Sequence, residues 1–196
     1  LHHLLAGGEY GTPHLIDLIN HRYRPEPRTL DYPFAMVWDM SCHHFDNLVA
    51  LFGPVAWVTA VSHSAPWSAY PYDAGVSAVL EFQRGLVCTY QLTHQATVSD
   101  YRFLVQTERG GLEWDGRQWR FRARPNRHLG RNSETVPLES VATVRSEQGV
   151  VDDWYRYIVE GVEPGISGRH NLETLAVCEM VVRAATHRAP VERESL

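Results

Sequence analysis

The most constraining feature of this sequence is a change in the spacing of its apolar residues at Gly53-Pro54. In the segment before this pair, the apolar residues fall three and four positions apart, at Phe45, Leu48, Val49 and Phe52. That spacing is typical of one face of an α-helix, whereas the period of two that follows is typical of strands with one buried face. We therefore expect a helix over residues 42–52, ended by Gly53-Pro54, and a sheet after it.

Six segments after Gly53-Pro54 carry the alternating pattern and are rich in Val, Tyr, Trp and Thr, as strands are. They cover residues 55–63, 76–82, 86–95, 101–107, 112–114 and 118–123. The joins at Arg84-Gly85, Arg109-Gly110-Gly111 and Asp115-Gly116 have hairpin-turn residues. Such joins predict that neighbouring strands are antiparallel and that the sheet is a meander. A further extended segment, residues 14–23, precedes the helix.

Helical spacing occurs again near both ends of the chain. Residues 1–6 have the pattern of the end of a helix that stops at Gly7-Gly8. Residues 151–162 and 171–186 also have helical spacing, with Ser167 as a candidate cap of the last helix, while residues 124–148 are polar and irregular. At 196 residues the chain has the length of one domain. The predicted class is α+β: an open, mainly antiparallel sheet with helices packed on one face.

The charge and the cysteines argue against several partners and sites. The formal net charge is -5 and no basic run occurs, so neither nucleic acid nor an anionic membrane is an expected partner. No apolar stretch approaches the roughly 20 residues that span a bilayer. Cys42, Cys88 and Cys178 are too widely spaced for a disulfide framework or a paired zinc motif. We expect reduced thiols in a cytoplasmic protein.

Aromatic residues mark two further places. The segment 65–73 holds Trp67, Tyr70 and Tyr72 among prolines, which favours a lid or an interface loop over a spacer. In the last predicted hairpin, Trp114, Trp119 and Phe121 alternate with arginines and are expected to form cross-strand pairs. The alternating Arg120, Arg122 and Arg124 predict a charged face that is solvated or lies at a subunit contact.

Three segments of the chain share their order and spacing with a known family. The first is the glycine-rich turn at residues 8–13, and the second is an Asp-x-x-x-His-x-x-Asp pattern formed by Asp39, His43 and Asp46 and followed by Leu-Phe-Gly at 51–53. The third is residues 166–172, with Ala-Pro-Val at 189–191. Together they resemble the C-terminal domain of the Gfo/Idh/MocA oxidoreductases, whose founders act on glucose and inositol. One departure is His170, where the family usually has an acidic residue.

The resemblance implies roles for several residues. Asp39 and His43 correspond to the family's catalytic pair, in which the histidine typically takes or gives the hydroxyl proton while hydride moves to or from nicotinamide. Asp46 corresponds to a supporting residue of the helix, and we group it with His44 and His94 as candidate substrate-binding residues. The implied substrate is a sugar, polyol or similar secondary alcohol, and the implied cofactor of the full-length enzyme is NAD or NADP.

The resemblance also implies a homodimer or homotetramer formed through the open face of the sheet. Large apolar residues on both faces of the predicted strands fit a sheet that is covered twice. They include Val79, Val87, Tyr90 and Phe103.

Two parts of the family's machinery have no counterpart in this sequence. The family's catalytic lysine lies in a Glu-Lys-Pro motif of its nucleotide-binding domain, and this chain contains no lysine. It also lacks a Gly-x-Gly-x-x-Gly turn that would hold a pyrophosphate. We therefore expect residues 1–196 to be the substrate-binding and oligomerisation domain alone, with Leu1 to Gly8 as the end of the linker helix. No Rossmann domain, bound cofactor or independent activity is expected of the chain.

The residues by themselves leave alternatives open. Asp39 and His43 are four apart and would lie on one face of a helix, where a carboxylate makes an imidazole a usable acid-base group; an aspartate there is also a common cap. A metal site is not expected, because the adjacent His43 and His44 would point about 100° apart. His94 ends a predicted strand, where it would either face substrate or be exposed.

Two functions are consistent with the sequence. The first is the substrate-side domain of an NAD(P)-dependent dehydrogenase. The alternative is a non-catalytic, stand-alone module that kept the sheet for dimerisation or ligand binding.

Overall fold

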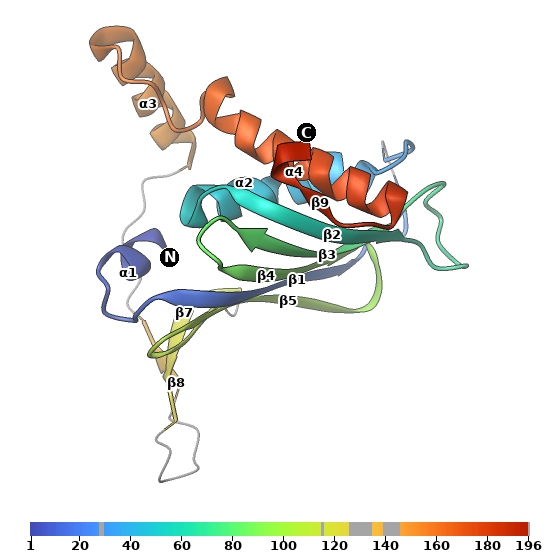
Figure 1. Cartoon of the computed structure of the whole chain (residues 1–196), viewed down its shortest axis with the longest axis horizontal. Coiled ribbons are helices and arrows are strands. Elements are labelled where there is room, and N and C mark those ends of the chain that lie inside the picture. The colour runs from blue at the N-terminus through green and yellow to red at the C-terminus, as the bar shows by residue number, and fades with distance from the viewer. Residues whose placement is uncertain (28–29, 115, 126–134, 139–145, 196) are drawn as a thin grey trace.

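The structure is a computed structural model that describes residues 1–27, 30–114, 116–125, 135–138 and 146–195. Within these residues, strands form one layer and α2 and α4 lie across one of its faces (Figure 1). The helical elements are α1 (His2–Ala6), a π-helical segment (Met36–Ser41), α2 (Cys42–Phe52), α3 (Ser146–Glu160), α4 (Gly168–His187) and a 3₁₀ turn (Arg193–Ser195). The strands are β1 (Pro13–Tyr23), β2 (Val55–His63), β3 (Gly75–Phe82), β4 (Val87–Thr93), β5 (Gln95–Thr107), β6 (Gly110–Trp114), β7 (Trp119–Ala123), β8 (Thr135–Pro137) and β9 (Val191–Glu192).

The described strands form a single sheet in the order β8-β7-β6-β5-β1-β4-β3-β2-β9. The α+β class and the mainly antiparallel sheet are confirmed. The prediction of a continuous meander is wrong at one place, because β1 lies between β4 and β5 and pairs in parallel with β4. A parallel pair needs a long crossover instead of a hairpin turn, and here the connection after β1 passes through α2 before the chain enters β2. β8 lies in the region that was predicted to be irregular.

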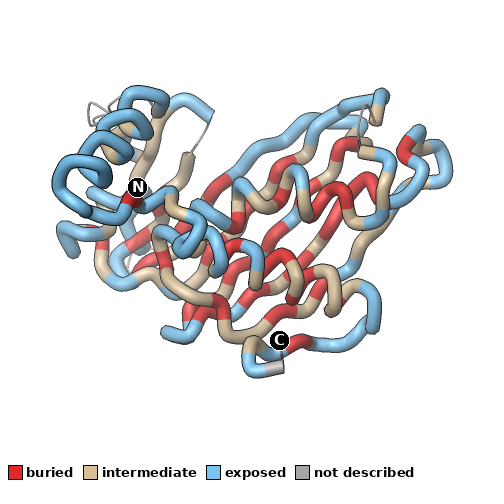
Figure 2. Tube along the Cα trace, turned by 90° about the horizontal axis from the view of Figure 1, so that it is seen from above, coloured by how far each residue is buried: buried red, intermediate tan, exposed pale blue. Residues whose placement is uncertain are grey.

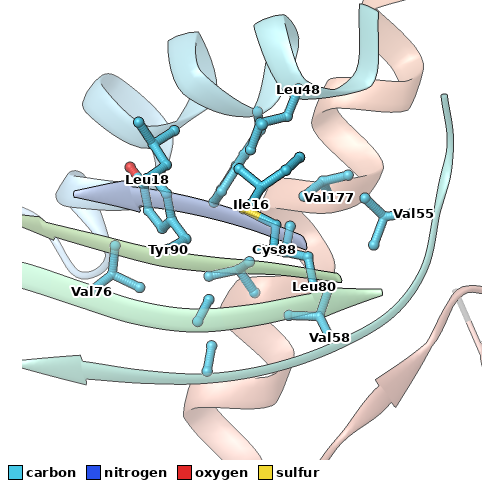
Figure 3. Close-up of a cluster of buried hydrophobic side chains, with 14 of the residues drawn as sticks. Ile16, Leu18, Leu48, Val55, Val58, Val76, Leu80, Cys88, Tyr90 and Val177 are labelled. Carbon is cyan, nitrogen blue, oxygen red and sulfur yellow. The ribbon is translucent and has the colours of Figure 1, made fainter. Parts of the chain in front are cut away.

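The core lies between the sheet and the two helices that cover it. Every second residue of the central strands points toward these helices and is buried, as the burial pattern of β1 and β4 shows. Figure 2 shows the buried positions concentrated along the strands. In Figure 3, Ile16 and Tyr90 of the sheet lie against Leu48 of α2 and Val177 of α4. The sheet thus fixes α2, the helix that begins just after the Asp39 segment.

The alternation of side chains along each strand also determines which of the predicted apolar residues lie on the face of the sheet that the helices leave uncovered. Tyr90 and Phe103 are buried in the core beneath the helices, whereas Val79 and Val87 occupy the alternate positions and are partly exposed. Trp114 and Trp119 are directly paired across β6 and β7, with ring centroids 5.7 Å apart, as predicted.

The helix α4 begins at the predicted cap. The Ser167 side chain accepts a hydrogen bond from the backbone N–H of His170, which satisfies one of the unpaired donors of the first turn. None of the helices formed by the described residues combines the length and the apolar character that crossing a bilayer requires.

Candidate functional site

Asp39 lies on a π-helical turn that precedes α2. In this segment the backbone bonds close five residues apart, as in the bond from the Cys42 N–H to the Val37 carbonyl. The start of the segment is held from a distance by Asp73, whose carboxylate accepts hydrogen bonds from the backbone N–H groups of Phe34 (2.6 Å) and Met36 (3.3 Å). The loop before β3 therefore anchors the turn that presents Asp39.

Asp39 and His43 are both exposed, at the end of the π-helical turn and the start of α2. Among the described residues, no hydrogen bond or ion pair joins their side chains. The wider π-turn accounts for this, because residues four apart are aligned only at the 3.6-residue spacing of an α-helix. Asp39 instead lies near the Tyr32 hydroxyl, and burial together with this carboxylate raises the pKa of Tyr32 to about 12.

His94 follows β4 directly and is fully buried, so it is not the exposed strand-end histidine that the sequence allowed. Its Nδ1 atom is 3.2 Å from the Tyr70 hydroxyl, which donates to the Arg24 carbonyl at 3.0 Å. Its Nε2 atom is buried and has no hydrogen-bond partner in the described part of the chain. Burial, with the nearby cations of Arg24 and Arg22, lowers the pKa of His94 to about 4.

Asp39 and His94 line one open groove of about 620 Å³, a volume within the range of ligand sites. Met40 and Tyr70 also line it, together with residues 23–27 at the end of β1. His43 is not among the lining residues. The structure therefore brings together two of the five predicted site residues, Asp39 and His94, in this groove.

His44 is held by protein on both sides of its ring. Its Nε2 atom is 3.2 Å from the Asn20 amide nitrogen, and its Nδ1 atom is 2.8 Å from the Tyr90 hydroxyl. The orientation of the Asn20 amide is fixed, because Arg22 Nε donates to its oxygen at 2.9 Å. The amide nitrogen must therefore donate to Nε2, which leaves the ring hydrogen on Nδ1 to donate to Tyr90.

Tyr90, the last member of this series, lies beside the π-helical segment. Ser41 is the next polar side chain beside Tyr90, and the Ser41 hydroxyl donates to the Met36 carbonyl at 2.8 Å. An arginine that can only donate begins the series of hydrogen bonds, so each bond from Arg22 through Asn20 and His44 to the Tyr90 oxygen has one direction. Burial, Arg22 and His43 lower the pKa of His44 to about 4, which favours this neutral state.

Asp46 also contacts protein. Its Oδ1 atom accepts a hydrogen bond of 3.0 Å from the Thr174 hydroxyl, which ties α2 to α4. A substrate contact by either His44 or Asp46 would have to compete with these bonds, and their assignment as binding residues stays a prediction.

A second groove lies among β5, β6 and β7, away from Asp39 and His94. It has a volume of about 700 Å³ and contains Arg102, Arg120 and Arg122 together with Glu108 and Glu113. Within the described residues, no group of three or more His, Cys, Asp or Glu side chains is placed to hold a metal ion.

Several residues of the site were not found from the sequence. Tyr70 lies in the aromatic segment 65–73, whose composition was a usable signal. Asn20 occupies a buried position of β1 among apolar residues, and a polar residue there is also a signal. Asp73 and Tyr32 lie in loops without any pattern, and only the folded chain brings them to the Asp39 segment.

Comparison with known proteins places the fold. Residues 1–113 match a family model described as the GFO/IDH/MocA C-terminal domain. No curated protein matches the sequence.

Solved structures share the fold at low sequence identity. An oxidoreductase from Agrobacterium radiobacter in complex with NAD+, L-tartaric acid and magnesium has a TM-score of 0.81 and 15% identity, over 98% of this chain and 60% of its own. Aldose-aldose oxidoreductase from Caulobacter crescentus, complexed with glycerol, has a TM-score of 0.78 and 20% identity, over 97% and 58%. Levoglucosan dehydrogenase, in complex with NADH, has a TM-score of 0.74 and 15% identity, over 97% and 61%. The chain thus spans less than two thirds of each of these proteins.

Proposed function

The chain belongs to the family of GFO/IDH/MocA C-terminal domains, and from this premise we propose that it is the substrate-side domain of an NAD(P)-dependent dehydrogenase. The proposed reaction is hydride transfer to or from a sugar, polyol or similar secondary alcohol. The observation that carries the proposal is the groove, because its lining combines the exposed Asp39 with His94, whose buried Nε2 atom has no hydrogen-bond partner among the described residues. Native proteins rarely leave such an atom unpaired, so a ligand group is a natural partner.

His43 is the proposed proton-transfer residue. Oxidation of a secondary alcohol releases the hydroxyl proton as the hydride leaves the carbon, and an imidazole is well suited to accept a proton near neutral pH. The exposed side chain of His43 is accessible to a substrate that lies over the π-helical turn and the start of α2. In the reverse direction the imidazolium returns the proton to the carbonyl oxygen.

Asp39 is proposed to orient the reacting alcohol. Its carboxylate lies near the Tyr32 hydroxyl and has lone pairs available to a substrate hydroxyl. Its backbone is fixed through the bonds of Asp73 to Phe34 and Met36. Such fixed geometry is what positioning an alcohol for reaction requires.

The cofactor is proposed to be held by a separate nucleotide-binding domain. When bound, NAD or NADP accepts or supplies the hydride. The residues of this chain fit the substrate side of such a reaction, since they offer His94 Nε2, which has no partner in the described part of the chain, and the separate exposed side chains of Asp39 and His43. They include no glycine-rich fingerprint for a pyrophosphate, so we propose that the chain alone is inactive.

The open face of the sheet is proposed to form a homodimer or homotetramer contact. Partly exposed apolar residues, among them Val79 and Val87, lie on it beside the polar positions of the strands. Analytical ultracentrifugation tests this, with Val79→Glu expected to shift the protein toward monomer by placing a charge in the contact. A monomeric wild-type protein at micromolar concentration would contradict the proposed oligomer.

The test of the catalytic proposal is His43→Ala in the enzyme that contains this chain and its nucleotide-binding domain. Turnover of the preferred polyol is expected to fall by about two to four orders of magnitude, the usual contribution of general acid-base catalysis, with folding unchanged. His187→Ala, which removes an exposed histidine from the far end of α4, is the matched control. Equal turnover in both variants would overturn the role of His43. An absence of NAD(P)-dependent turnover in the wild type would favour the non-catalytic binding module.

A further inference from the structure

We propose that Tyr70 holds His94 in a single tautomer, so that His94 Nε2 is a fixed hydrogen-bond acceptor and the groove selects ligands by their hydroxyl donors. This inference rests on the proposed function, because it concerns the same groove. It assigns Tyr70 as a positioning residue and His94 as a determinant of specificity.

The tautomer follows from the single hydroxyl hydrogen of Tyr70. That hydrogen is donated to the Arg24 carbonyl oxygen, which is 3.0 Å away and cannot donate in return. At 3.2 Å from His94 Nδ1, the tyrosine oxygen can then only accept. The ring hydrogen of His94 therefore lies on Nδ1. In a neutral imidazole this leaves a bare lone pair on Nε2.

The surroundings of His94 keep the ring neutral. The side chain is fully buried, and the cations of Arg24 and Arg22 disfavour a further positive charge. Nε2 has no partner among the described residues. An unpaired buried acceptor destabilises a protein, so a ligand that donates to it removes this cost on binding.

Asp39 is a second hydrogen-bond acceptor in the groove and strengthens the preference for ligands that carry hydroxyl donors. Asp39 is an acceptor when ionised, and it lines the same groove as His94. A compound with several hydroxyl groups can donate to both residues and still accept from others. Ethers and ketones offer oxygen acceptors alone, and a carboxylate would also meet the like charge of Asp39. Arg24 and Glu26 at the same groove have opposite charges, so they give no net preference for an ion. The ligand class that fits is a neutral polyhydroxy compound.

The first test measures the tautomer directly. Nitrogen NMR of histidine-labelled protein at neutral pH distinguishes a bare from a hydrogen-bearing ring nitrogen. For His94 we expect hydrogen on Nδ1 and a bare Nε2. In Tyr70→Phe we expect loss of this preference and a mixture of tautomers, which a purely structural role of Tyr70 would not produce. Tyr72→Phe, in the same loop and exposed, is the matched control and should leave the spectrum of His94 unchanged. Hydrogen on Nε2 in the wild type would overturn the proposal.

The second test uses sorbitol and its fully O-methylated derivative as probes. The two share their oxygen acceptors, but only sorbitol has hydroxyl donors. We expect sorbitol, and not the methylated compound, to move the Nε2 resonance of His94, and we expect His94→Phe to weaken sorbitol binding about fivefold, the factor for one net hydrogen bond. An equal response to both probes, or none to sorbitol, would overturn the donor selection. These outcomes are independent of the turnover of His43→Ala, so the proposed function can fail while the tautomer assignment stands, and the reverse.

Discussion

Tyr90→Phe removes one oxygen atom from the directed hydrogen-bond chain and leaves the packing of the ring in place. Tyr90 is buried completely and contacts Phe45 of α2, with ring centroids 4.9 Å apart, so the phenylalanine ring keeps these contacts. The substitution leaves His44 Nδ1–H without its acceptor at 2.8 Å. A buried donor without a partner costs about 1–3 kcal/mol, and hence we expect the free energy of unfolding to fall by about 2 kcal/mol.

For a domain of this length, that change corresponds to a fall in Tm of roughly 4–8 °C. Urea denaturation and calorimetry of the purified chain measure both quantities. Tyr155→Phe is the matched control, because Tyr155 is 64% exposed on α3 and its replacement should change stability by less than about 0.5 kcal/mol. If the two variants are equally stable, the hydrogen bonds from Asn20 through His44 to Tyr90 do not stabilise the position of α2.

Three further predictions concern pH, a helix cap and a glycine. The pKa of His44 is about 4 in the folded protein and about 6.5 when unfolded, so the unfolded state takes up the proton first. Stability should therefore fall as pH drops from 6.5 to 4, with His44 contributing up to about 1.4 kcal/mol per unit beside a like contribution from His94, and His44→Asn should remove the His44 share of this slope in urea titrations. Ser167→Ala should cost about 1 kcal/mol by removing the cap of α4, whereas Ser167→Asp should keep the stability in the same denaturation assay. Gly110→Ala places a Cβ against the Arg122 carbonyl oxygen and should destabilise by about 1–3 kcal/mol, measured as a lower Tm. Gly149→Ala, where open space surrounds the site on α3, should stabilise the protein by up to about 1 kcal/mol. A change in Tm of the same sign in the Gly110 and Gly149 variants would contradict the steric argument.

Much of the local structure could be predicted because its causes are local. The helix and strand on either side of Gly53-Pro54 have the predicted bounds, Cys42–Phe52 and Val55–His63. Their periodicity follows from which side chains are buried, and a helix and a strand bury different positions. The Ser167 cap was predictable for the same reason, since capping involves groups within one turn.

The candidate site was predictable only in part. The pattern of Asp39, His43 and Asp46 could be read from the sequence, but the expected alignment of Asp39 with His43 assumed an α-helix. The π-helical turn is stabilised by Asp73, more than thirty residues later in the chain, so no window of sequence around Asp39 contains its cause.

The sequence by itself determined the helix and strand segments, the turns, the caps and the family pattern, because each depends on residues that are close together in the chain. Only the tertiary structure decided that β1 pairs with β4, that Asp73 and Tyr32 lie against the Asp39 segment, and that Tyr70 lies beside His94. These contacts join residues that belong to different strands and loops. Hydrogen bonds and burial act over a few ångströms in space, and the sequence does not show which distant residues the fold places within that range.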